Sequence, residues 1–257
     1  MDNKILDKAI LFAVEKHSGM KRKGKNLPFI LHPMETVAIV GSITDDVELM
    51  AAAALHDVIE NADVTYEEIL ERFGKRIADI VAAESENKRT DQSAADTWKI
   101  RKTEYLKNLQ SASLDVKTVA LADKLSNLRE IYMDRCYVAD EIWNRFNCKE
   151  KIEHEWFYRC IVFLTKDLSY THAWIDLEWH VNKVFGVDSN VDIFDVCDKP
   201  EPDFIENGYD FDSAFFKWNC PIHDYMSRLI EDIYPNLEVI GSIEFNGNDY
   251  LEAIINK

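Results

Sequence analysis

The first 186 residues carry apolar positions at helical spacing, separated by short breaks. One such stripe lies between residues 3 and 17 and consists of Ile5, Ala9, Ile10, Ala13 and Val14. Gly19 ends this helix, and Pro33 suits the first position of a second helix that continues to about Val40. The chain therefore opens with two helices joined by a loop.

The helical pattern continues well beyond this pair. A third helix is expected from about residue 46 to 60, because its small apolar run is typical of a helix buried on most sides. Thr65 and Glu68 form a capping box for a short helix, which Gly74 ends. Further helical patterns cover residues 75–84, 96–109, 115–134, 138–166 and 169–186. The sequence thus predicts an all-α domain over residues 1–186.

The pattern changes after Gly186. Residues 187–206 are acidic and contain two prolines, which predicts a linker or irregular segment. A helix is expected over about 213–234, interrupted near Pro221. Two strand-like runs, 237–245 and 250–255, then flank Asn246-Gly247-Asn248, which is a hairpin signal. We expect a small α+β extension over residues 187–257, for which the sequence indicates no specific role.

Composition agrees with a helical protein. Hydrophobic residues make up 47% of the chain, and there are only 8 glycines and 6 prolines. No apolar run approaches the roughly 20 residues that span a bilayer, and no signal-peptide stretch follows Met1. The five cysteines form no CxxC pair, which favours reduced thiols. We therefore expect a cytoplasmic protein without a membrane partner.

Charge is distributed unevenly along the chain. The net charge of −17 makes nucleic acid a poor candidate partner, because phosphate backbones bind basic surfaces. Residues 187–257 hold 16 of the 47 acidic residues but only 4 of the 30 basic ones. We expect this acidic tail to lie away from an anionic substrate and to serve packing or self-association into a homo-oligomer. By contrast, residues 16–25 contain five cations.

The adjacent pair His56-Asp57 is the strongest local indication of chemistry. An imidazole nitrogen and a carboxylate oxygen together suit Mn, Fe or Zn. An ionised Asp57 beside a buried apolar run is costly unless a cation pairs with it. Glu60 follows one helical turn later, where its carboxylate would lie near the metal without being a ligand. That position suits proton transfer from an attacking water.

Two further segments add candidate ligands. His32 directly precedes Pro33, which starts a helix and so fixes the position of the imidazole. Asp123 and Asn127 are one turn apart in an otherwise apolar helix, where a lone carboxylate would be an anomaly. Two histidines and two aspartates from three helices would form a partly open metal site with room for a water and a phosphate oxygen.

These segments resemble the hydrolase domain of RelA/SpoT homologues, particularly the small alarmone hydrolases. The family pattern reads approximately KHxGQxRKxGxPYIxHP, then ALLHDVxED, then VKLADRLxNMR. The matching segments here are 16–33, 53–61 and 119–129, and the resemblance covers about residues 5–180. It implies an HD-domain helical bundle that removes the 3′-pyrophosphate from (p)ppGpp with a divalent metal, usually Mn²⁺.

The resemblance also implies roles for individual residues around the metal. The metal ligands would be His32, His56, Asp57 and Asp123. Glu60 would position or activate the attacking water. The family's second acidic residue is replaced by Asn61, which can orient a water but cannot take up a proton at neutral pH.

The resemblance assigns substrate binding to the basic loop, residues 16–25, and to the third motif, residues 119–129. Arg22 and Lys23 match the cationic pair that contacts the nucleotide, and Asn127 matches the asparagine that faces it. Lys21 adds positive charge in the same loop, which a highly phosphorylated nucleotide needs on a protein of net charge −17. The usual glutamine after Gly19 is Met20 here.

Two other functions remain open at this point. The chain could be an HD phosphohydrolase of a different nucleotide, such as the adenine alarmone (p)ppApp. It could also be a catalytically weak nucleotide-binding module in which Asn61 marks lost turnover. Glu60 argues against the second alternative, because a decayed site would have little reason to keep this carboxylate on the metal face.

Overall fold

The computed structural model describes residues 4–187, 189, 191–198, 204–207, 212–218, 230–231, 234, 236–245 and 248–255. The chain divides into two compact units. One comprises Met1–Thr165 and Thr171–Cys197, and the other comprises Lys166–Tyr170 and Asp198–Lys257. The boundary expected from the sequence lies after Gly186, and it stays a prediction.

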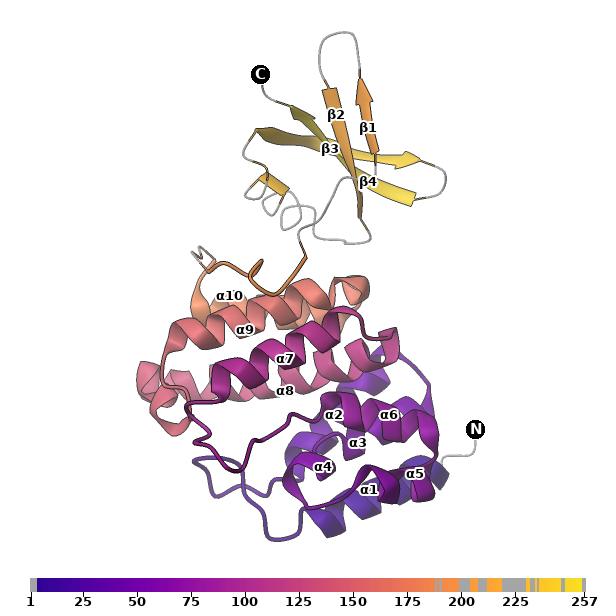
Figure 1. Ribbon diagram of the computed structural model, residues 1–257, viewed down its shortest axis with the longest axis vertical. Helices are drawn as coiled ribbons and strands as arrows, with labels where there is room; N and C mark the ends of the chain where they lie inside the picture. Colours follow the sequence, from indigo (N-terminus) through magenta and orange to yellow (C-terminus); the bar gives the residue numbers. More distant parts are fainter. Residues whose placement is uncertain are drawn as a thin grey trace. The chain divides into compact units, whose positions relative to one another are not determined.

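The larger unit is built from helices (Figure 1). The α-helices of the chain are α1 Lys4–Lys16, α2 Leu31–Ile43, α3 Val47–Leu55, α4 Val58–Asn61, α5 Tyr66–Phe73, α6 Lys75–Glu84, α7 Trp98–Gln110, α8 Leu114–Val138, α9 Lys151–Leu164 and α10 His172–Phe185. Two 3-10 helices, η1 Ala139–Arg145 and η2 Lys166–Leu168, follow α8 and α9. The all-helical HD-type bundle predicted from the sequence is confirmed.

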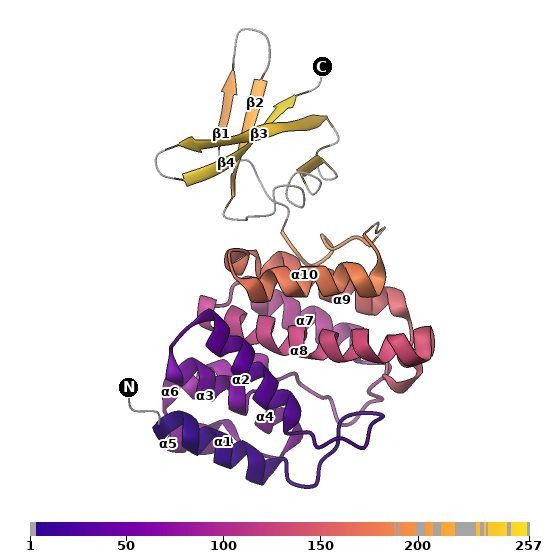
Figure 2. The ribbon, with the colours of Figure 1, turned by 180° about the vertical axis from the view of Figure 1, so that it is seen from behind.

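Helix α8 forms the centre of this bundle. It packs against α2, α3, α6, α9 and α10, and Figure 2 shows α9 and α10 alongside it. Every side chain from Thr118 to Ser126 is buried, so this stretch has neighbours on all sides. A charged side chain in this stretch must find a partner inside the protein, and Asp123 is such a side chain.

The third predicted helix is interrupted at the candidate metal ligands. Helix α3 ends at Leu55, and α4 begins at Val58, with His56 and Asp57 in a turn between them. At this break His56 Nδ1 donates to the carbonyl oxygen of Ala53 at 2.8 Å, the acceptor that the Asp57 N–H would use in a continuous helix. The expectation of one continuous helix to Glu60 was therefore wrong.

The helix expected over 138–166 was also wrong as a single element. Ala139 has a φ of 49°, which ends α8, and the chain continues as η1 before α9 begins at Lys151. The aromatic residues of this region pack against one another instead of extending one helix. Trp143, for example, stacks on His154 with ring centroids 4.8 Å apart.

The smaller unit contains a four-stranded antiparallel sheet in the order β1-β2-β4-β3. Its strands are β1 Phe204–Asn207, β2 Asp212–Trp218, β3 Leu237–Phe245 and β4 Asn248–Ile255. The predicted hairpin strands β3 and β4 are confirmed, and residues 246 and 247 of the turn lie outside the described residues.

Two expectations for this unit were wrong. The helix predicted to begin at 213 is the strand β2 up to Trp218, and the predicted irregular segment contains the start of β1. The pairing of β2 with β4 holds this segment as a strand, and its aromatic residues Phe215, Phe216 and Trp218 suit that state. Pro221, where an interruption was expected, lies outside the described residues.

Residues 191–197 pack on the helical bundle beyond the predicted boundary. The Trp156 indole donates to Asp195 Oδ1 at 2.9 Å, and Ile193 and Val196 are buried. A chain ending after Gly186 should therefore be less stable than one ending after Cys197 by roughly 3–6 kcal/mol, since each buried aliphatic side chain contributes roughly 1.5–3 kcal/mol. Thermal and urea unfolding of the two truncated chains would measure this, and equal stabilities would contradict it.

None of the helices in the described part of the chain is both long and apolar enough to cross a bilayer.

Candidate metal centre

His32 lies in the first turn of α2, with its ring buried and held in one orientation. The Ser126 hydroxyl donates to Glu35 Oε2 at 2.8 Å, so it accepts from His32 Nδ1 at 2.9 Å. A neutral imidazole that donates through Nδ1 presents a lone pair at Nε2. His32 is therefore set up as an Nε2 ligand.

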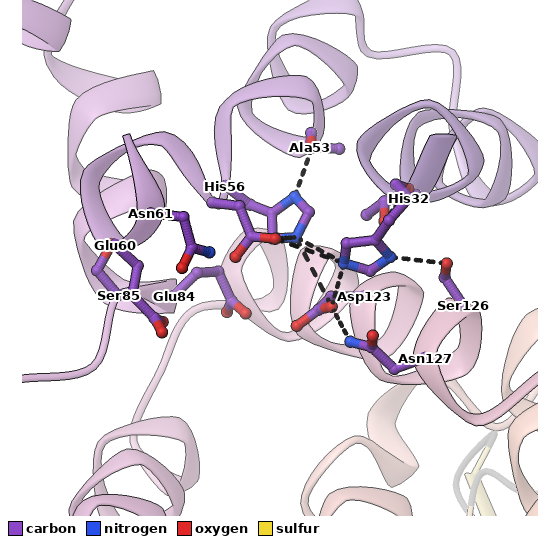
Figure 3. A network of polar contacts seen from close by, with 12 residues as sticks. His32, Ala53, His56, Glu60, Asn61, Glu84, Ser85, Asp123, Ser126 and Asn127 are labelled. Atoms are coloured by element: carbon purple, nitrogen blue, oxygen red, sulfur yellow. Dashed lines mark hydrogen bonds and ion pairs between the residues drawn. The ribbon is translucent and has the colours of Figure 1, made fainter. Parts of the chain in front are cut away.

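His56 is oriented in the same way from the turn between α3 and α4. Its Nδ1 bonds to the Ala53 carbonyl oxygen, which can only accept, so the proton resides on Nδ1. The Nε2 atoms of His56 and His32 face each other at 3.2 Å (Figure 3). Two lone pairs at this distance repel unless a proton or a cation lies between them, which is how metal-binding histidines are arranged.

Two carboxylates complete the cluster. Asp57 Oδ2 lies 3.3 Å from His56 Nε2 and 3.6 Å from His32 Nε2. Asp123 Oδ1 lies 3.0 Å from His32 Nε2 and 3.6 Å from His56 Nε2. Donors about 2.1 Å from a common cation would be about 3.0–3.4 Å apart. The ligand atoms of His32, His56 and Asp57 all lie within 4.8 Å of one another, as a shared divalent metal requires, and Asp123 Oδ1 lies next to both histidines.

The pKa values of the cluster show its demand for positive charge. Burial would raise the pKa of the carboxyl groups of Asp57 and Asp123, but the imidazoles of His56 and His32 lower the pKa of Asp57, and Lys124 together with these imidazoles lowers that of Asp123. Burial would lower the pKa of His56, but the two carboxylates raise it well above its ordinary value. A divalent cation would satisfy the same demand, so the donor set fits the metal that the sequence implies.

The second oxygen of Asp123 is held by Lys124. This ammonium group is buried, contacts Asp123 Oδ2, and lies 3.9 Å from Glu84 Oε2. Burial raises the pKa of Glu84 to about 7. No role for Lys124 or Glu84 was predicted from the sequence, although the adjacent charges of Asp123 and Lys124 inside an apolar helix were a signal for Lys124. Together they fix which oxygen of Asp123 faces the histidines.

Glu60 and Asn61 lie on the side of His56 opposite to His32 (Figure 3). Burial, with Asp57 and Glu86 nearby, raises the pKa of Glu60, whose Oε1 lies 3.9 Å from Lys88 Nζ. Asn61 Oδ1 accepts from the same ammonium group at 2.9 Å. Within the described residues neither side chain bonds to the metal-ligand cluster, and their catalytic roles stay predictions.

The basic loop contacts the cluster through Asn127. Arg22 donates to Asn127 Oδ1 at 2.8 Å, and Asn127 Nδ2 donates to Asp123 Oδ1 at 2.6 Å. Lys23 Nζ donates to Asn147 Oδ1 at 3.2 Å, and Lys21 is exposed. The structure therefore joins Arg22 and Asn127 to the ligand Asp123, while Lys21 and Lys23 lie further out, and binding of the nucleotide by these four residues stays a prediction.

A second group of charges lies beside Glu60. The Glu86 side chain, only 6% exposed, pairs with Arg101 at 2.6 Å and with Lys102 at 2.5 Å. Glu86 is close enough to Glu60 to raise its pKa. These cations come from the start of α7, which is distant in sequence from the three motifs. The contact of these two cations with Glu86 could not be predicted from the sequence.

The chain is similar to known proteins in sequence and in fold. A family model described as HD domain matches residues 9–144. The guanosine-3′,5′-bis(diphosphate) 3′-pyrophosphohydrolase MESH1 of Danio rerio is 34% identical over 153 residues, which is 58% of this chain and 79% of the relative. The guanosine-3′,5′-bis(diphosphate) 3′-pyrophosphohydrolase of Aquifex aeolicus is 33% identical over 133 residues, which is 51% of this chain and 18% of that protein.

The solved structure of a metazoan ortholog of SpoT has the same fold. It superposes with a TM-score of 0.56 at 20% identity, covering 71% of this chain and 97% of the solved one.

Proposed function

The chain belongs to the HD domain family, and we propose that it is a 3′-pyrophosphohydrolase of guanosine alarmones, with Mn²⁺ as the divalent metal. The substrates are (p)ppGpp, and the products are GDP or GTP and pyrophosphate. One observation carries this proposal: two anchored imidazoles and two carboxylates converge in a chain that is 34% identical over 153 residues to a relative named for this activity.

The side chains at the site have separate roles in the reaction. His32, His56, Asp57 and Asp123 would hold the metal, which when bound supplies a Lewis acid that lowers the pKa of water and polarises phosphate oxygens. Glu60 accepts a proton from the attacking water, for which a raised pKa is suited.

The covalent change takes place at the 3′ ester. Water adds to the phosphorus attached to ribose O3′, the P–O3′ bond breaks, and O3′ leaves with a proton. Arg22 and Lys23 provide cationic groups for the phosphates of the substrate, and the link through Asn127 to Asp123 orients the Arg22 guanidinium relative to the metal ligands.

Product analysis tests the proposed reaction. Phosphorus NMR of an early time point with ppGpp, Mn²⁺ and no added pyrophosphatase should show pyrophosphate and GDP in equal amounts. Orthophosphate together with a triphosphorylated guanosine would overturn the proposed chemistry even if the metal site were correct. Turnover of pppGpp and of the adenine counterparts in the same assay would establish the base selectivity.

A further inference from the structure

One buried histidine differs from the others in its hydrogen bonding. In the part of the chain that the structure describes, the buried histidines are His17, His32, His56, His154 and His180. Four have a polar partner, such as the Cys148 carbonyl for His154 and the Asp176 carbonyl for His180. His17 is 2% exposed, yet neither of its ring nitrogens has a hydrogen-bond partner.

His17 lies beside the metal-ligand cluster. Its backbone continues α1, with its N–H bonded to Ala13 O at 2.9 Å, so its position is fixed. Its ring packs against Phe29 with ring centroids 4.8 Å apart, and the ring centroids of Phe29 and His32 are 6.2 Å apart. Burial lowers the pKa of His17, Asp57 raises it, and His56 and His32 lower it. The ring of His17 is thus separated from the proposed ligand His32 by the single side chain of Phe29.

The cluster is most accessible on the side of Asp57. The Asp57 side chain is 18% exposed, whereas those of His32, His56 and Asp123 are 3%, 2% and 7% exposed. Solvent therefore reaches the cluster on the side of Asp57.

Burying an imidazole without hydrogen-bond partners is energetically unfavourable. Burial lowers the pKa of His17, so at neutral pH the ring carries one N–H donor and one acceptor. Leaving both unsatisfied costs free energy, and native proteins avoid it unless water or a ligand supplies the partner. An anionic phosphate oxygen accepts hydrogen bonds and would pair with the N–H group.

We propose that His17 is a substrate contact, which donates a hydrogen bond from its ring N–H to an oxygen of the pyrophosphoryl group while its other nitrogen accepts from water. This rests on the proposed function, because that reaction places a pyrophosphoryl group at the metal-ligand cluster. A neutral donor here would bind the pyrophosphoryl group without adding another charge beside the metal.

Inorganic pyrophosphate is the probe that tests this contact, by calorimetric titration of the Mn²⁺-loaded protein. His17→Phe preserves the ring that packs on Phe29 and removes both nitrogens. It should weaken pyrophosphate binding about 10- to 100-fold, the range for one hydrogen bond to a charged group. The affinity for Mn²⁺ alone should stay within about twofold, and the melting temperature should stay the same or rise.

His180→Phe is the matched control, because it removes a buried imidazole that has a protein partner. This variant should lose stability but bind pyrophosphate as the wild type does. His17→Asn and His17→Gln place an amide N–H near the Nδ1 and Nε2 positions, and one of them should recover much of the lost affinity.

Unchanged pyrophosphate binding in His17→Phe, or a loss of stability like that of His180→Phe, would make His17 a structural residue and overturn the proposal. A wild-type protein that binds no pyrophosphate would also overturn it. If the wild type binds pyrophosphate through His17 but turns over no alarmone, the proposed function fails and the contact stands.

Discussion

Asp57→Ala should abolish stoichiometric metal binding and turnover while leaving the helical content largely intact. Asp57 supplies one of the two carboxylates, and its loss leaves three donors and a smaller negative charge to hold a cation. It is also the most exposed of the four ligands and lies in a turn, so its removal leaves little void. Elemental analysis after dialysis, with circular dichroism on the same sample, measures both outcomes.

Asp79→Ala is a suitable control for this variant. Asp79 forms an exposed ion pair with Lys75 and accepts a hydrogen bond from Tyr66 on a helix outside the cluster. The control should keep one metal per chain and full turnover. Finding one bound metal per chain in Asp57→Ala would remove the basis for the proposed ligand set.

Glu60→Gln should lower kcat by about 10²–10⁴-fold with the metal retained, the usual contribution of a positioned base. The amide keeps the size of the side chain but cannot take up the proton. Asn61→Ala should cost less, because Asn61 pairs with Lys88 in the structure, and Asn61→Asp should preserve or raise turnover. Steady-state kinetics with ppGpp distinguishes these variants. An unchanged kcat in Glu60→Gln would mean that another group is the base.

The pH dependence of kcat should also show whether Glu60 is the base. A base must be ionised to act, so turnover falls as the pH drops through the pKa of Glu60. Burial, Asp57 and Glu86 raise that pKa, which moves the acidic limb of the profile toward neutral pH. The limb should disappear from the residual activity of Glu60→Gln. A profile that is identical in the two proteins would argue against Glu60 as the base.

The sequence was most informative where the chemistry is local. The pair His56-Asp57 and the His32-Pro33 step each predicted a ligand, and the structure brings these residues together with Asp123. Their interpretation depended on the cost of burying charge in apolar helices, which can be judged from neighbouring residues alone. Metal binding by these residues stays a prediction.

Features that depend on distant contacts could not be predicted in this way. Glu86 meets Arg101 and Lys102 across a long connection, and no periodicity along the chain indicates that contact. The strand β2 is another case, because its partner β4 is far away in the sequence. The orphaned ring of His17 is visible only once every possible partner has been located.

The four proposed ligands come from α2, the turn after α3, and α8, so the cluster joins stretches that are far apart in sequence. A cation held there would act as a cross-link that unfolding must release. By mass action, the free energy of unfolding then rises with the logarithm of the free metal concentration above the dissociation constant. The lifetime of the folded chain against cellular proteases would consequently depend on metal supply, which couples the abundance of the enzyme, and not only its rate, to metal starvation.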